Sequence, residues 1–75
     1  MKDLLIYLAK SLVDKPELVQ VNEVQGERST ILELKVDPED MGKVIGKQGR
    51  IAQALRVIVK AAAVKEGKRI MIEII

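Results

Sequence analysis

The chain has 75 residues, a formal net charge of +2, one aromatic residue, and neither cysteine nor histidine. A chain of this length makes one domain, and without these two residue types it holds no disulfide or zinc staple. A histidine or cysteine catalyst is excluded, so we expect no enzyme, no cofactor and no metal site. No apolar segment is long enough to span a membrane, and we expect a cytoplasmic protein with an aliphatic core.

Residues 4–13 predict an opening helix. Asp3 is placed to cap its N-terminus, and Pro16 ends it because the residue before a proline avoids the α region. Asp3 and Lys10 interrupt the apolar run, so it does not match a secretory signal peptide. Tyr7 is expected to pack within the domain. The core face of this helix is expected to hold Leu5, Leu8 and Leu12, with Leu4 and Ala9 beside them.

Two short segments predict a β-hairpin. Residues 18–25 and 30–36 alternate apolar and polar side chains, which is typical of strands with one buried face. In the second segment the leucines and the final valine share one face, and a glutamate and a lysine share the other. The turn at residues 26–29 is short, so we expect the two strands to pair antiparallel.

The second half of the chain predicts two helices and a last strand. Asp37 and Pro38 form a strong helix start, because Asp caps and Pro fits the first helical position. That helix is short, since Gly46 follows within about two turns. A longer helix is expected over residues 50–65, and a final strand over 70–75. The order α-β-β-α-α-β predicts an α+β domain, a three-stranded mixed sheet with helices packed on one face.

The long helix carries two apolar stripes. One is expected to face the core and consists of Ile51, Leu55, Ile58 and Ala62, flanked by Val59. The other consists of Ala54, Val57, Ala61 and Val64. Only one of the two stripes can fit into the core. The second is either helix-favouring alanine with incidental exposed valine, or the interface of a dimer or partner protein, since small side chains let helices approach closely.

The net charge conceals a strong asymmetry. Residues 1–40 hold five basic and nine acidic residues, a net of −4, whereas residues 41–75 hold eight and two, a net of +6. Residues 41–65 contain no acidic residue at all. An acid-free basic run of this length around a glycine-rich turn points to a polyanionic ligand.

That turn is Gly46-Lys47-Gln48-Gly49, a G-x-x-G pattern between two predicted helices. A P-loop is excluded, because Gly42 and Gly46 have the wrong spacing and Gln48 stands where Ser or Thr must bind magnesium. A dinucleotide fingerprint and a membrane G-x-x-x-G motif are excluded by spacing and context. A glycine turn at a helix N-terminus suits phosphates, because free backbone N–H groups and the helix dipole both favour anions.

The sequence therefore predicts a clamp for the sugar-phosphate backbone of a single-stranded nucleic acid. Phosphates would lie on the turn, with Lys43 assisting, and bases would lie on aliphatic side chains beside it. The expected contact residues are Lys43, Val44, Ile45, Gly46, Lys47, Gln48, Gly49, Arg50 and Ile51. Charge alone does not separate RNA from single-stranded DNA, because only contacts to the 2′-OH would do so.

The segment from Val44 to Ile51 resembles the V-I-G-x-x-G signature of KH domains, whose G-x-x-G loop clamps about four nucleotides. The element order is similar to the bacterial type II arrangement, in which the first and last strands of the KH motif run parallel. The whole chain, residues 1–75, resembles the stand-alone KH proteins of the KhpA (YlqC) family. Ala52 departs from the aliphatic residue that many KH domains carry three positions after the second glycine.

The resemblance implies a small RNA-binding protein that acts as an RNA chaperone, as a homodimer or with a KhpB-like KH protein. It also implies a role in post-transcriptional regulation and in cell elongation and division. Two alternatives stay open from the residues alone. They are a protein-interaction module that works through the second stripe of the long helix, and a single-stranded DNA-binding adaptor.

Overall fold

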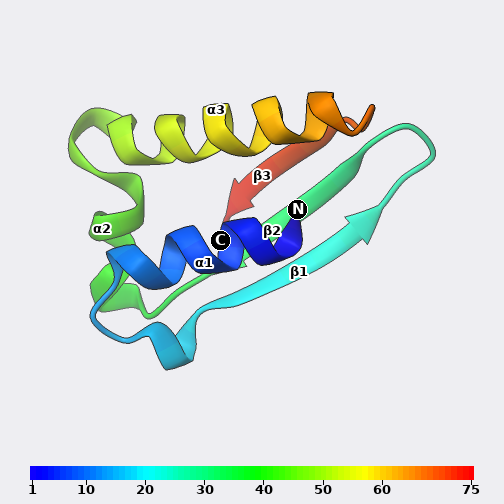
Figure 1. Cartoon of the computed structure of the whole chain (residues 1–75). Helices are drawn as coiled ribbons and strands as arrows, with labels where there is room; N and C mark the ends of the chain where they lie inside the picture. Colours follow the sequence, from blue (N-terminus) through cyan, green and yellow to red (C-terminus); the bar gives the residue numbers. More distant parts are fainter.

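The computed structural model describes all 75 residues. Its elements are α1 (Lys2–Leu12), β1 (Gln20–Gln25), β2 (Thr30–Lys35), α2 (Met41–Ile45), α3 (Arg50–Lys65) and β3 (Ile70–Ile74) (Figure 1). Short 3-10 turns span Pro16–Leu18, Pro38–Asp40 and Lys47–Gly49. The predicted order and the α+β class are confirmed.

The three strands form one mixed sheet in the order β1-β2-β3. β1 and β2 pair antiparallel, from Gln20 opposite Lys35 to Gln25 opposite Thr30, so the hairpin prediction is confirmed. β2 and β3 pair parallel, with Leu32 opposite Ile72. The chain between β2 and β3 contains the glycine turn and its two helices, because two parallel strands are joined by a long crossover. β3 is the last strand in the sheet order, so its outer edge has no partner strand.

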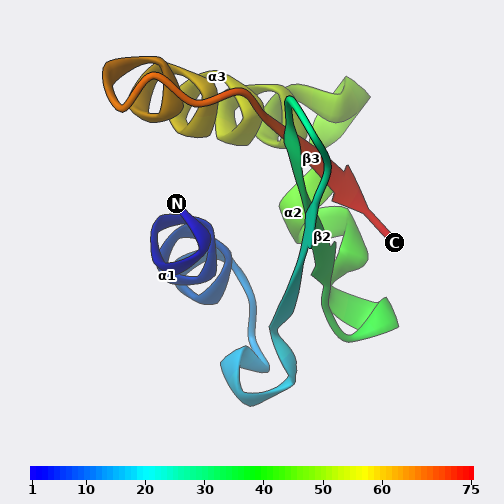
Figure 2. The same cartoon turned by 90° about the vertical axis from the view of Figure 1, so that its right-hand side faces the viewer.

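The core lies between the sheet and two helices. α1 and α3 lie on the same side of the sheet, as Figure 2 shows with the sheet seen along its edge. Leu32 and Leu34 on β2 are fully buried there, together with Leu5 on α1, and the alternating side chains of β2 face the other way. α2 closes one end of this core through Val44, which is also fully buried. Burial of each such side chain stabilises the fold by about 1.5–3 kcal/mol.

Three predictions for the first half of the chain are wrong in detail. α1 begins at Lys2, so Asp3 lies within its first turn and makes no capping hydrogen bond, although its charge still suits the helix dipole. The first strand begins at Gln20 and not at Leu18, because Pro16 favours a 3-10 turn over Pro16–Leu18, just before the strand. Tyr7 does not pack in the core, and 69% of its side chain is exposed.

The core face of α3 is rotated from the predicted one. Leu55 and Val59 are buried as expected, but Ile58 is 46% exposed, and Ile51 is only half-buried. Ala52 and Ala63 are buried in place of these two isoleucines. Small side chains on the buried face let a helix approach a sheet closely, which is consistent with alanines at these two positions.

A buried carboxylate fixes α2 against the end of α1. Asp40 is 2% exposed and accepts hydrogen bonds from the backbone N–H groups of Asp14, at 3.3 Å, and Lys15, at 3.0 Å. The predicted Asp37 cap is also present, because its carboxylate accepts the N–H of Glu39 at 2.8 Å. A buried acceptor with two donors is costly to remove. Asp40 therefore sets the position of the helix that leads into the glycine turn.

Candidate functional site

The glycine turn joins α2 to α3 through three residues with positive φ. Gly46 has a φ of +76°, Gln48 of +58° and Gly49 of +74°. Gln48 is the one residue other than glycine in the chain with a positive φ. A side chain in this left-handed region costs about 1–2 kcal/mol, and such local strain is found most often at functional sites.

The two glycines of the turn serve different purposes. A Cβ on Gly46 would lie 2.5 Å from Cγ1 of Ile51, so this position must stay empty for the first turn of α3 to pack on it. A Cβ on Gly49 would meet nothing within 4 Å. The first glycine therefore holds the turn against α3, whereas the second leaves an open surface on its outer side.

Only some of the turn amides are free. The N–H of Gly49 donates to the carbonyl of Gly46 at 3.1 Å, and the N–H of Arg50 donates to the carbonyl of Lys47. The N–H groups of Lys47 and Gln48 come before the first hydrogen bond of this 3-10 turn, so the turn itself gives them no acceptor. These two amides, at the positive end of the α3 dipole, can bind an anion.

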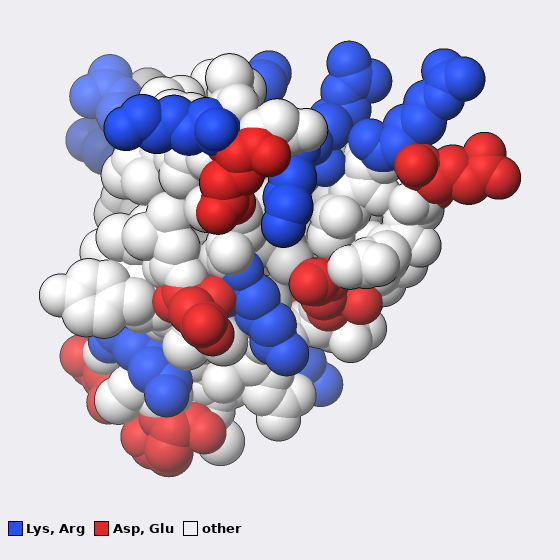
Figure 3. Space-filling view, turned by 45° about the vertical axis from the view of Figure 1, so that its right-hand side comes forward, with Lys and Arg blue, Asp and Glu red and all other residues white.

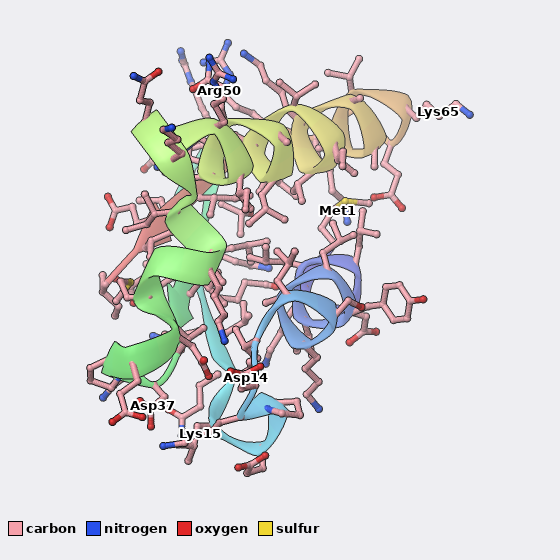
Figure 4. All side chains as sticks on the ribbon, turned by 90° about the vertical axis from the view of Figure 1, so that its left-hand side faces the viewer. Met1, Asp14, Lys15, Asp37, Arg50 and Lys65 are labelled. Carbon is pink, nitrogen blue, oxygen red and sulfur yellow. The ribbon has the colours of Figure 1, made fainter.

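The basic side chains in and beside the turn are exposed, and all but one of them are unpaired. Lys47, Gln48 and Arg50 are exposed, and Arg50 projects from the end of the molecule opposite the acidic cluster around Asp14 and Asp37 (Figure 4). Lys43 is the exception, because its ammonium group donates to the Asp14 carboxylate. This hydrogen bond, with the nearby charges of Asp14 and Asp40, raises the pKa of Lys43 against a smaller desolvation effect. Lys43 thus belongs to the structural link between α1 and α2.

The predicted aliphatic contacts fall in three different environments. Val44 is fully buried in the core, so it supports α2 from beneath and cannot contact a ligand. The prediction for Val44 is wrong because its side chain points inward from a helix only five residues long. Ile45 is 38% exposed, and Ile51 is half-buried against Gly46. Of the three, Ile45 offers the most apolar surface beside the turn.

The structure adds a groove that the sequence analysis did not include. A hollow of about 500 Å³ runs between α3 and the free edge of β3. Arg56 and Lys60 line it from the helix, and Arg69 lines it at the start of the strand. The remaining lining residues are Ile70, Met71 and Ile72. The sequence does contain one indication of this groove. Arg56 and Lys60 are four residues apart and continue a polar stripe that starts with Arg50 and Gln53 along one side of α3.

Charge is separated across the molecule. All four ion pairs involve either Lys15 or Lys43, which meet four carboxylates near the end of α1; they are Lys15–Asp37, Lys15–Glu39, Lys43–Asp14 and Lys43–Asp40. Every basic residue from position 44 onward lacks an acidic partner. In the space-filling view, most Lys and Arg side chains lie in the upper part, where α3 runs, and most Asp and Glu side chains lie lower (Figure 3). The turn and groove therefore lie in a zone of positive potential.

The outer face of α3 is apolar and uncovered. The residues of the second stripe, Ala54, Val57, Ala61 and Val64, are all exposed, as predicted. Val57 is 60% exposed and Val64 67%. Ile58 adds to this face because of the rotation of the helix described above. The outer face is formed by Ala54, Val57, Ile58, Ala61 and Val64.

Comparison with known proteins agrees with this geometry. The sequence model of the family described as KhpA/KhpB, KH domain, matches residues 2–74. The chain belongs to this family. A protein of Clostridium perfringens named RNA-binding protein KhpA is 72% identical to this chain over the full length of both. Proteins of the same name from Caldanaerobacter subterraneus and Aquifex aeolicus are 65% and 52% identical over the whole of this chain, covering 100% and 95% of their own lengths. No solved structure matches the chain.

Membership of the KhpA/KhpB family confirms the resemblance that the G-x-x-G signature and the element order predicted. The match spans the sheet, the glycine turn and all three α-helices, so it concerns the complete fold described here. No helix of the chain combines the length and apolar character that a membrane span requires.

Proposed function

We propose that this chain is a small RNA-binding protein whose glycine turn clamps the sugar-phosphate backbone of single-stranded RNA. One observation carries the proposal: the turn at the start of α3 is exposed and cationic, and a basic groove lies between the same helix and the free edge of β3. The names of its relatives support RNA as the ligand. We place phosphates on the amides of Lys47 and Gln48 and the side chains of Lys47, Gln48 and Arg50.

We place the bases in the groove. The apolar floor of Ile70 to Ile72 suits flat base surfaces, and the unpaired backbone of β3 offers both donors and acceptors to base edges. Arg56 and Lys60 would contact the backbone from the opposite wall. No aromatic side chain lines the groove, so the roughly 1–3 kcal/mol per base that aromatic stacking gives is absent. Affinity per domain should therefore be weak and largely electrostatic.

Salt dependence tests this mode of binding. If two to four phosphates are neutralised, the logarithm of the association constant will fall against the logarithm of salt concentration with a slope of about −1.4 to −2.8. Fluorescence anisotropy of a labelled single-stranded RNA measures this slope. A duplex RNA of the same length is the control, and it should bind much more weakly because its bases cannot enter the groove. Salt-independent binding, or equal binding of duplex and single strand, contradicts the clamp.

The second alternative, a single-stranded DNA-binding adaptor, is tested in the same titration. A DNA strand of identical sequence differs chiefly in lacking 2′-OH groups. Tighter binding of RNA supports the proposed function, whereas equal or tighter binding of DNA supports the adaptor.

A second proposed activity is association through the outer face of α3, either as a homodimer or with a KhpB-like KH protein. The carrying observation is that five small or aliphatic side chains lie together in solvent on a domain with a modest core. A dimer would also place two weak clamps on one RNA and raise the overall affinity.

Introducing a charge by Ala61→Asp should raise the dimer dissociation constant on the order of a hundredfold, because the contact would bury an unpaired carboxylate. Sedimentation equilibrium measures the association, and circular dichroism shows whether the monomer stays folded. Gln20→Asp is the matched control, since it adds the same charge at an exposed position on β1, away from α3. Unchanged association of Ala61→Asp would exclude this face as the interface.

We propose a binding protein and not an enzyme. The RNA-chaperone activity and the role in post-transcriptional regulation and cell elongation and division stay predictions from the resemblance, and the cytoplasmic location stays a prediction from the sequence.

A further inference from the structure

A second hollow lies at the opposite end of α3 from the glycine turn. It measures about 320 Å³ and forms where the start of α1, the β1–β2 turn and the segment between α3 and β3 meet. Figure 1 shows the β1–β2 turn and the segment between α3 and β3 at the same end of the molecule, with the start of α1 on the side of α1 nearer to them. We call this hollow the far-end cradle and define it by its four cationic side chains, which are Lys2, Arg28, Lys68 and Arg69.

The far-end cradle is positively charged. Its four basic side chains are all exposed, and none of them forms an ion pair. Two carboxylates, those of Glu23 and Glu27, also line it, so basic side chains outnumber acidic ones by four to two. Neither carboxylate lies within ion-pair distance of a basic group. A concave surface with this balance attracts an anion.

Backbone hydrogen bonds hold the cradle together. The N–H of Thr30 donates to the carbonyl of Arg69 at 2.9 Å, which joins β2 to the segment before β3. The N–H of Lys68 donates to the carbonyl of Ala63 at 2.9 Å, which ties the same segment to the last turn of α3. The chain positions that carry Lys68 and Arg69 are therefore fixed relative to the sheet and helix.

The cradle adjoins the groove. Arg69 and Ile70 line both hollows, so the two hollows meet at the start of β3. The glycine turn lies at the other end of α3, whose 16 residues span roughly 24 Å. Turn, groove and cradle thus succeed one another along the length of α3.

We propose that the far-end cradle binds a further phosphodiester of the same RNA strand after the strand leaves the groove, an inference that rests on the proposed function. The lining favours a phosphate, because its cations come from separate elements and stand around a polar hollow. The consequence is a binding site that extends past the β1–β2 turn. Affinity should then rise with RNA length beyond about four nucleotides.

The test compares oligouridylates of about four and about ten nucleotides, titrated against wild type and Arg28→Gln/Lys68→Gln. Wild type should bind the longer strand more tightly. The variant should lose about tenfold in affinity for the longer strand and about 0.7 in its salt slope, with the short strand changed by less than about twofold. The matched control is Lys10→Gln/Lys35→Gln, which removes the same charge from two exposed lysines outside the hollow and should leave both affinities nearly unchanged.

Three results of this titration would overturn the inference. They are equal wild-type affinity for both strand lengths, equal weakening of both strands in the variant, and an equal effect of the control. Inorganic pyrophosphate, followed through the amide NMR signals of Lys68 and Arg69, distinguishes the RNA strand from a free anion as the source of the phosphate. Pyrophosphate binding that the longer strand does not displace would show an independent small-anion site and contradict the proposal, whereas displacement by that strand supports it. If wild type binds neither strand, the proposed function itself fails, and this outcome is distinct from the others.

Discussion

The variant Lys47→Asp/Gln48→Asp should bind single-stranded RNA at least about a hundredfold more weakly than wild type while remaining folded. Both side chains are exposed, and neither forms an ion pair or a side-chain hydrogen bond. The substitution removes a cation and adds two carboxylates where phosphates would lie. Aspartate also tolerates the left-handed backbone of position 48, so the turn can keep its shape. Fluorescence anisotropy at low salt measures the affinity, and urea denaturation checks the fold.

The matched control is Lys10→Asp/Gln20→Asp, which makes the same change of charge at two exposed positions on α1 and β1. It should lower affinity only slightly, through the weaker long-range attraction of the whole molecule. Retained RNA binding by a folded Lys47→Asp/Gln48→Asp variant would refute the clamp, and an equal loss in the control would show a nonspecific charge effect.

Gly46→Ala should lower the free energy of unfolding by roughly 2–4 kcal/mol, because it combines a left-handed backbone strain with overpacking. The new Cβ would lie 2.5 Å from Cγ1 and 2.9 Å from Cδ1 of Ile51. The first turn of α3 would have to move, so RNA affinity should fall as well. Urea denaturation followed by circular dichroism measures the stability change.

Gly49→Ala should be much milder. Gly49 lies in the αL region (φ 74°, ψ 14°), which alanine can enter, whereas Gly46 (φ 76°, ψ 173°) lies in a region that only glycine adopts readily. A Cβ on Gly49 would also point into open space, so this substitution should cost only about 1 kcal/mol. In an Ile51→Ala background, Gly46→Ala should cost less than in wild type, because two of the three clashing atoms are gone. Equal costs of Gly46→Ala in both backgrounds would show that packing against Ile51 does not fix the turn.

The elements that depend on local chemistry are predictable from the sequence. The bounds of α3 follow from the glycines before Arg50 and the glycine after Lys65, and the Asp37 cap follows from the residue types at a helix start. Alternation along β2 identifies its buried face. Each of these signals involves residues a few positions apart, so no knowledge of distant contacts is needed.

The remaining features depend on residues far apart in the chain. Lys43 is basic and close to the turn in the sequence, yet its ammonium group pairs with Asp14, which lies 29 positions away. The rotation of α3 depends on how closely Ala52 and Ala63 approach the sheet, which the helical pattern alone does not reveal. The groove requires knowing that β3 is an edge strand parallel to β2. The far-end cradle likewise joins Lys2 and Arg28 to Lys68 only in the folded chain.

The free edge of β3 has a consequence for the behaviour of the protein at high concentration. Unpaired strand edges invite pairing with another chain and lead to aggregation. In this molecule Arg56, Lys60 and Arg69 border that edge, and a second copy approaching along it would bring three further cations against them. The basic residues that prepare the groove for a polyanion thus also keep two sheets from joining, and this protection should weaken as salt screens the repulsion.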